Sequence, residues 1–332
     1  MELAEAFAPS AVPPIDPKHD MSDIQLRAAV AALESGDADG AVLFAHRITS
    51  PFVAATLRAD RRFDAIVARD PDAFDVARLI AAQLARARQA VASRPHVMRA
   101  HADLVIALHV AERFSESLQE ADRILAGKQA SPGSLQDDWG GCAAVCAFSW
   151  RSSALMALGR DQEAMSMWAT DGRSAGNIGV AEMLMYEALP AQSLALIEQA
   201  SDEGRDRRER ADLARLRACD YAELHLDAKA ARQVSVMEAH AEYPPDAVLQ
   251  AQVCTGDQDA AARLLIAMLE DPVRRSMGLA EAQIYRVAHV PPFAQELRRR
   301  YSQLLARPDV KAALDKVGRS NAYDMPRYTS IR

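Results

Sequence analysis

The sequence is poor in aromatic residues and in cysteine, and it carries no surplus of positive charge. Aromatics make up 5% of the 332 residues, whereas half of the chain is hydrophobic and alanine is about one residue in five. Alanine carries the smallest free-energy penalty in a helix and lets two helices approach closely. Alternating runs of β-branched residues, which would predict strands, are also missing. The composition therefore favours closely packed helices over a sheet.

The lack of positive charge bears on the partners of the protein. The formal net charge is -7 and the pI is near 5.7, which opposes a general attraction to nucleic acid or to an anionic membrane. The arginines between Arg205 and Arg217 are interleaved with acidic residues, so pairs within one helix can neutralise them. No run reaches the roughly 18 uncharged apolar residues of a transmembrane helix. We expect neither a nucleic-acid partner nor membrane insertion.

The four cysteines, Cys142, Cys146, Cys219 and Cys254, are too few for a disulfide framework in a chain of this size. Cys142 and Cys146 are four residues apart in an apolar stretch, so a helix would place both on one face. A zinc site would need further ligands, and no histidine lies between His109 and His225. We interpret the cysteines as structural and expect no metal.

Both ends of the chain lack a helical pattern. Residues 1–20 contain four prolines and lack the basic start and apolar core of a signal peptide, which predicts a disordered or extended segment. The protein is then cytoplasmic, or it is periplasmic or exported if a leader has been removed, because the Pro-rich opening resembles the start of a mature exported bacterial protein. Residues 319–332 have no helical stripe and are expected to form a tail that is ordered only where it docks.

A short turn pattern recurs between apolar stretches of helical spacing. It occurs at Leu33–Ala41, Leu158–Ala164 and Cys254–Ala261, and a fourth copy at Val110–Ser117 has lost its glycine. In these turns the glycine can end one helix and the aspartate after it can cap the next. Four copies of one junction predict a series of helical hairpins.

These junctions resemble the tetratricopeptide repeat, in which small residues flank a Gly-Asp-like turn and an aromatic residue follows it. The matching residues are Ala31, Gly36 and Ala41; Ala107, Phe114 and Ser117; Ala154, Gly159 and Ala164; and Ala251, Gly256 and Ala261. The aromatic position is kept only as Phe114. The resemblance implies an all-α fold, an α-α superhelix of about 12 to 16 helices. It would span residues 21–318, with a possible subdivision near 129–138.

Helical stripes fill the chain between these turns. We predict a helix at Phe74–Ser93 that is capped by Asp70, and a pair at Arg208–Leu226 and Ala228–Ala241. A polar, glycine-rich loop is predicted at Thr170–Gly179. The last helix, Pro308–Val317, begins with proline and is followed by a glycine, which suits a helix that covers the end of a solenoid.

The motifs of common catalytic sites are missing. The sequence has no phosphate-binding glycine loop with its lysine, no His-Glu-x-x-His helix and no Gly-x-Ser-x-Gly elbow. The methionines at positions 156, 165, 167, 183 and 185 are interpreted as core residues that fill gaps. We therefore predict no catalytic residue and no cofactor.

The resemblance also implies a binding surface. In a stacked array the first helix of each hairpin lines the concave side, and the turns set which side chains face it. The residues predicted to line this groove are Met98, Ala102, His109, Ser149, Ser153 and Met156. The function that follows is a non-catalytic scaffold or adaptor that binds a protein or peptide. Two alternatives stay open: a structural or assembly subunit of a larger complex, and a helical enzyme or ligand sensor whose pocket has no recognisable motif.

Overall fold

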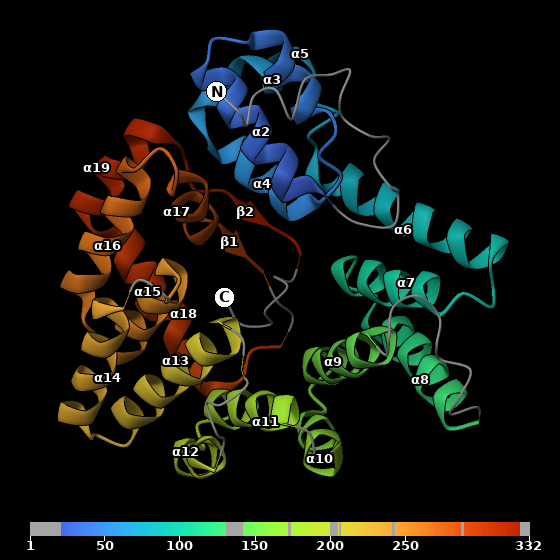
Figure 1. The fold of residues 1–332 in the computed structure, drawn as a ribbon, viewed down its shortest axis with the longest axis vertical. Coiled ribbons are helices and arrows are strands. Elements are labelled where there is room, and N and C mark those ends of the chain that lie inside the picture. Colours follow the sequence, from blue (N-terminus) through green and yellow to red (C-terminus); the bar gives the residue numbers. More distant parts are fainter. Residues whose placement is uncertain are drawn as a thin grey trace.

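Alpha-helices account for most of the residues that the computed structural model describes. The described residues are 21–130, 142–171, 174–199, 205, 207–240, 243–286 and 289–325, and the predicted N-terminal segment lies outside them. They contain 18 α-helices. This is more than the 12 to 16 expected, because several short helices lie between the longer ones. The all-α prediction is thus confirmed within this part of the chain (Figure 1).

The helices of the N-terminal half are α2 (Ser22–Glu34), α3 (Ala38–Ala45), α4 (Pro51–Ala59), α5 (Asp64–Arg69), α6 (Val76–Ser93), α7 (Met98–Val110), α8 (Phe114–Ala130), α9 (Cys142–Ala157) and α10 (Asp161–Asp171). A 3-10 turn, η1 (Arg61–Phe63), precedes α5. Those of the C-terminal half are α11 (Ser174–Tyr186), α12 (Pro190–Glu198), α13 (Arg207–Glu223), α14 (Asp227–Ala239), α15 (Pro245–Thr255), α16 (Gln258–Glu270), α17 (Arg275–Glu281), α18 (Pro292–Ala306) and α19 (Pro308–Val317).

Six helix pairs in the described residues are joined by the same kind of turn. One residue in each turn has a left-handed φ of 57° to 81°: Gly36, Glu112, Gly159, Ala188, His225 and Gly256. The N–H of the residue after it donates to the carbonyl five residues earlier, as from Asp37 to Ala32 at 2.8 Å and from Leu226 to Tyr221 at 2.8 Å. This is the Schellman arrangement, which satisfies carbonyls that a helix end leaves without partners. Chemically different sequences therefore form one repeated hairpin.

Two local predictions were wrong. Helix α6 begins at Val76 and is capped by Asp75, whose carboxylate accepts from the Arg78 N–H at 2.8 Å, because Asp70 instead holds the preceding turn through the Ala73 N–H. The glycine-rich loop expected at 170–179 is largely helical, since α11 already begins at Ser174. Glycine lowers helix propensity by about 1 kcal/mol, which packing against neighbouring helices can override.

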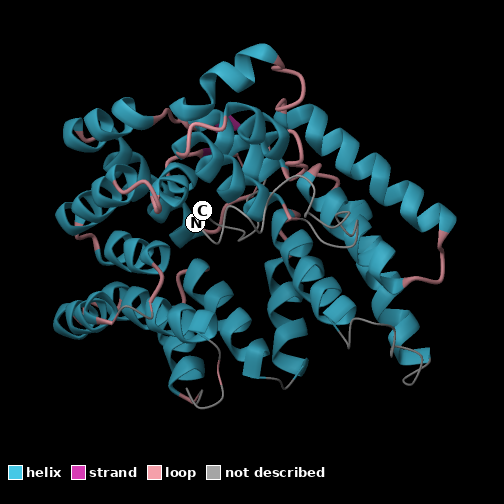
Figure 2. Ribbon diagram, turned by 45° about the horizontal axis from the view of Figure 1, so that its top comes forward, coloured by secondary structure: helices cyan, strands magenta, loops and turns pink. Residues whose placement is uncertain are grey.

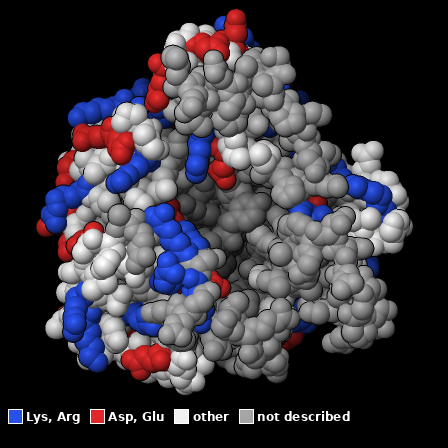
Figure 3. Space-filling model, in the orientation of Figure 1, with Lys and Arg blue, Asp and Glu red and all other residues white. Residues whose placement is uncertain are grey.

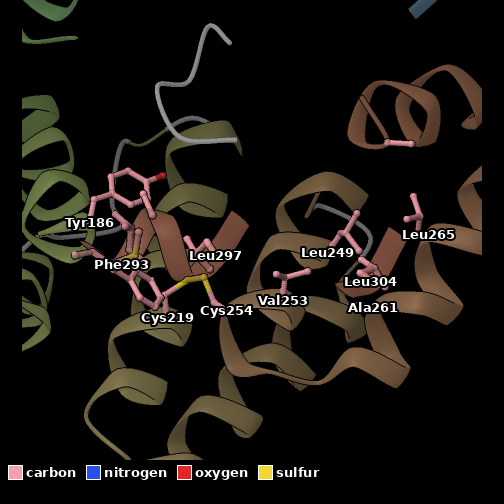
Figure 4. Close-up of a cluster of buried hydrophobic side chains, with 14 of the residues drawn as sticks. Tyr186, Cys219, Leu249, Val253, Cys254, Ala261, Leu265, Phe293, Leu297 and Leu304 are labelled. Carbon is pink, nitrogen blue, oxygen red and sulfur yellow. A yellow bond between two sulfur atoms is a disulfide. The ribbon is translucent and has the colours of Figure 1, made fainter. Parts of the chain in front are cut away.

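The largest hydrophobic core extends through the C-terminal half of the chain. Figure 4 shows that a disulfide bond between Cys219 of α13 and Cys254 of α15 lies in this core, beside Phe293 and Leu297 of α18. Both cysteines are almost fully buried. The sequence predicted a structural role for these cysteines but no bond between them; the packing of α13 on α15 brings them together across a separation of 35 residues. The side chains of Cys142 and Cys146 lie outside the described part.

The two ends of the helical array meet. Helix α17 packs against α4, as Figure 1 shows, and α19 covers α16. At the contact Gly318 forms an antiparallel bridge with Asp60, and the Arg319 guanidinium pairs with the Asp64 carboxylate at 2.7 Å. We call this contact between residues 55–64 and residues 275–323 the seam. Because of the seam, the helical hairpins follow a closed path instead of ending in a free rod.

The C-terminal tail contributes to the seam. Strand β1 (Ile284–Tyr285) pairs in parallel with β2 (Ala322–Tyr323), and the Tyr323 hydroxyl donates to the Ala55 carbonyl at 3.4 Å. This short ladder is the only strand pair in the described residues, and it appears as two small magenta pieces among helices in Figure 2. The sequence predicted no strand, since two residues are too few to give a pattern.

Candidate functional site

A cleft of about 1660 Å³ opens between the first helices of the described chain and the last hairpins. Helices α2 and α4 line one side. The start of α13, the end of α14, and α15, α16 and α17 line the other. The two sides meet where α4 packs on α17 and where the Phe52 ring lies 5.9 Å from the Tyr285 ring. The seam therefore forms the cleft by joining elements that are more than 200 residues apart.

Apolar side chains are accessible in this cleft. Val273, in the turn between α16 and α17, is 90% exposed, and Met277 on α17 is 37% exposed. Val30 of α2 and Leu264 of α16 are half-buried and also line the cleft. Covering an apolar side chain as exposed as Val273 with a ligand removes apolar surface from water, which favours binding. The cleft can therefore bury an apolar group of a ligand.

The charged residues of the cleft are unequally paired. Four arginines and three acidic residues line it: Arg27, Arg207, Arg263, Arg274, Asp23, Glu34 and Glu238. Glu34 pairs with Arg62 at 3.1 Å, and Glu238 accepts from the Gln252 amide at 2.7 Å. Arg27 and Arg263 are exposed, and neither has an ion pair or hydrogen bond with a residue that the structure describes. These two guanidinium groups can each bind a carboxylate with two hydrogen bonds.

Figure 3 shows how charge is distributed over one face of the molecule. Lysine and arginine side chains are interspersed with aspartate and glutamate over the described part of this face. Many charged side chains of the described residues form ion pairs along or between helices, such as Arg151 with Asp122 and Arg300 with Glu223. Mixed signs of this kind do not make the continuous basic surface that a nucleic-acid backbone needs.

A serine and an aspartate that resemble part of a catalytic site, Ser193 and Asp220, are buried inside the protein. The Ser193 hydroxyl of α12 donates to the Asp220 carboxylate of α13 at 2.7 Å, and both residues are fully buried. Burial raises the pKa of Asp220 to about 7, against smaller lowering effects of the Ser193 hydrogen bond and the Arg215 charge. Because no surface of Ser193 or Asp220 is accessible, neither can contact a substrate in this conformation. The pair joins α12 to α13.

The concave-groove prediction differs from the observed burial. Ala102, His109 and Met156 are at most 6% exposed and lie within the helix packing, so they do not face an open groove. Met98 is half-buried against a small core of α7, α8 and α9, and Ser149 and Ser153 of α9 are half-buried. The physical reason is that α7 packs on α6, α8 and α9 and buries nine of its thirteen residues. Such a helix has little surface left for a ligand.

His109 illustrates this packing. Its ring lies between Phe114 and Trp150, with centroid distances of 5.0 and 4.8 Å. Burial lowers the pKa of His109 to about 4, so the imidazole is neutral at physiological pH. A neutral ring in edge contact with two aromatic rings is a packing element of the α7–α8 and α7–α9 contacts.

The sequence offered little indication of the cleft. Val273 and Met277 fall in and after the Asp-Pro turn between α16 and α17, where single apolar residues are common and uninformative. Arg27 and Arg263 stand on ordinary amphipathic helices. Only the three-dimensional path of the chain brings these four residues to one cleft.

The sequence matches no family model, no curated protein and no solved structure. Within the described residues, no group of three or more histidine, cysteine or acidic side chains is arranged to hold a metal ion. No described helix combines the length and apolar character needed to cross a bilayer.

Proposed function

We propose that the protein is a non-catalytic binding scaffold that holds a segment of a partner polypeptide in the cleft at the seam. In this proposal the chain is a tetratricopeptide-like superhelix whose hairpins position the cleft. The observation that carries it is the cleft itself, which is large enough for a peptide segment and lined by the exposed side chains of Val273 and Met277. The repeated Schellman turn supports the likeness to helical repeats, which commonly bind extended or helical peptides.

The cleft fits a polypeptide better than a small molecule. Small-molecule sites are usually 300 to 1,000 Å³ and enclose most of the ligand surface. This cleft has a larger volume, about 1660 Å³, and its lining comes from seven helices and the turns beside them. Its apolar and charged groups are distributed along both sides, as side chains of a bound peptide would require.

Selection from a library of random 16-residue peptides displayed on phage tests the proposal. We expect the purified full-length chain to enrich a family of related peptides. Synthetic copies should bind the double variant Val273→Glu/Met277→Glu at least about tenfold more weakly, since each carboxylate removes apolar contact in the cleft. Leu158→Glu is the matched control, because Leu158 is 38% exposed but lies at the α9–α10 turn outside the cleft.

Two results would contradict the proposed function. One is the absence of any enriched family; the other is unchanged binding by the double variant when its circular dichroism matches the parent. Light scattering of the purified chain addresses the assembly-subunit alternative, which predicts a stable oligomer that buries the apolar rim at Val273.

A further inference from the structure

We infer that the segment bound in the cleft is acidic, with carboxylates that flank an apolar side chain. This inference rests on the proposed function and adds the chemistry of the partner. It starts from Arg27 on α2 and Arg263 on α16, the two exposed lining cations that have no ion pair within the described residues. They belong to the two different sides of the cleft, so one ligand can meet both.

The other charges of the cleft leave this preference in place. Glu34 is already occupied by Arg62, which does not line the cleft, and Arg274 pairs with Asp271 at 3.5 Å. The Asp23 carboxylate stands in the first turn of α2, where the helix dipole favours negative charge. Four arginines thus line the cleft against three acidic residues, so the cleft has a positive formal charge on a protein whose net charge is -7. Local charge of this kind selects among partners and raises the association rate.

The apolar part of the ligand follows from the same geometry. Val273 and Met277 lie on the side to which Arg263 also belongs, so a segment that meets the arginines also covers apolar surface. A nucleic acid satisfies this arrangement poorly, because its phosphate backbone has no apolar side chain to cover Val273 and Met277. An acidic polypeptide with one or more large apolar residues is complementary to both features.

The test compares peptides selected by the parent with those selected by the charge-reversed variant Arg27→Glu/Arg263→Glu. We expect the parent pool to have a negative mean net charge and the variant pool to be neutral or positive. Synthetic parent-selected peptides should bind the variant about tenfold more weakly, and raising the salt from 50 to 500 mM should weaken binding to the parent much more than to the variant.

The variant Arg86→Glu/Arg94→Glu is the matched control. It changes the net charge by the same amount at two exposed arginines outside the cleft, so it should select the parent's acidic pool. The milder variant Arg27→Gln/Arg263→Gln tests the same point if charge reversal disturbs folding, and it should lose the acidic preference without gaining a basic one.

The other possible results of this selection separate the acidic preference from the proposed function. Enriched peptides with no acidic bias, or an acidic pool that persists in both cleft variants, would overturn this inference and leave the proposed function standing. The absence of enrichment on the parent would overturn both. Displacement of the selected peptide by a 16-nucleotide oligouridylate at comparable concentration would replace the acidic polypeptide by a nucleic acid.

Discussion

The backbone of Gly318 lies directly against that of Ala59. A β-carbon on Gly318 would come within 2.4 Å of the Ala59 carbonyl oxygen and equally close to a methyl group of Leu279. Gly318 directly follows the last helix, α19, and Ala59 ends α4, so the two ends of the array touch here only because Gly318 has no side chain. The cleft depends on the contact because α4 and α17, which pack on each other, line its two sides.

Replacing Gly318 by alanine should loosen the seam. The added methyl group must displace backbone or Leu279, and overpacking of this kind costs about 1 to 3 kcal/mol of unfolding free energy. Urea denaturation measures the loss, and hydrogen exchange should rise in residues 51–69 and 308–323. Gly36→Ala is the control, since it strains an open turn without touching the seam. Unchanged exchange at the seam in Gly318→Ala would contradict the account.

The left-handed turns predict a stabilising substitution. Ala188 is exposed and has a φ of 57°, a conformation that costs a non-glycine residue about 1 kcal/mol. Ala188→Gly should therefore raise the unfolding free energy by about 0.5 to 1 kcal/mol, and Gly256→Ala at the equivalent turn should lower it by a similar amount. Thermal denaturation of both variants measures the pair. Changes of the same sign would show that the turns are not equivalent.

The buried Asp220 carboxyl should make stability depend on pH. Its pKa is about 7 in the folded protein and 3.8 in an exposed chain, so the folded state holds a proton that the unfolded state has lost between these values. Its contribution to stability is fully present below pH 3.8 and is lost as the pH rises through 7. The slope is at most about 1.4 kcal/mol per pH unit.

Asp220→Asn keeps the shape of the side chain and removes its titration. The unfolding free energy of the parent minus that of this variant should fall as the pH rises from 4 to 7 and level off above 7. Ser193, Arg215 and Glu223 are the groups that act on this carboxyl, and all three are retained in the variant. Urea denaturation at several pH values gives the difference, and a constant difference across this range would contradict the assignment.

The hairpins could be predicted where the turn carries a glycine. Gly36, Gly159 and Gly256 signalled three turns, and the polar Val110–Ser117 stretch signalled a fourth. The turn at Ala188 was missed because alanine gives no indication that it will adopt a left-handed conformation. The local sequence thus identifies such a turn only when the residue with the left-handed φ is of a type that favours this conformation, such as glycine.

The faces of the helices were harder to predict. The repeat register directed His109 toward a groove, but α7 is enclosed by three helices, so its inner face is core. The cleft escaped prediction for a different reason. It is formed by residues far apart in sequence, such as Arg27 and Arg263, and their proximity depends on the closed path of the whole chain.

Photo-crosslinking at the cleft tests the central claim most directly. The purified chain with a benzophenone side chain at position 273 is irradiated with a fluorescent selected peptide, and the same is done with the group at position 158. The account predicts crosslinks from position 273 that excess unlabelled peptide abolishes, and few or none from position 158. Equal crosslinking at both positions, or crosslinking at position 158 alone, would show that the peptide binds elsewhere.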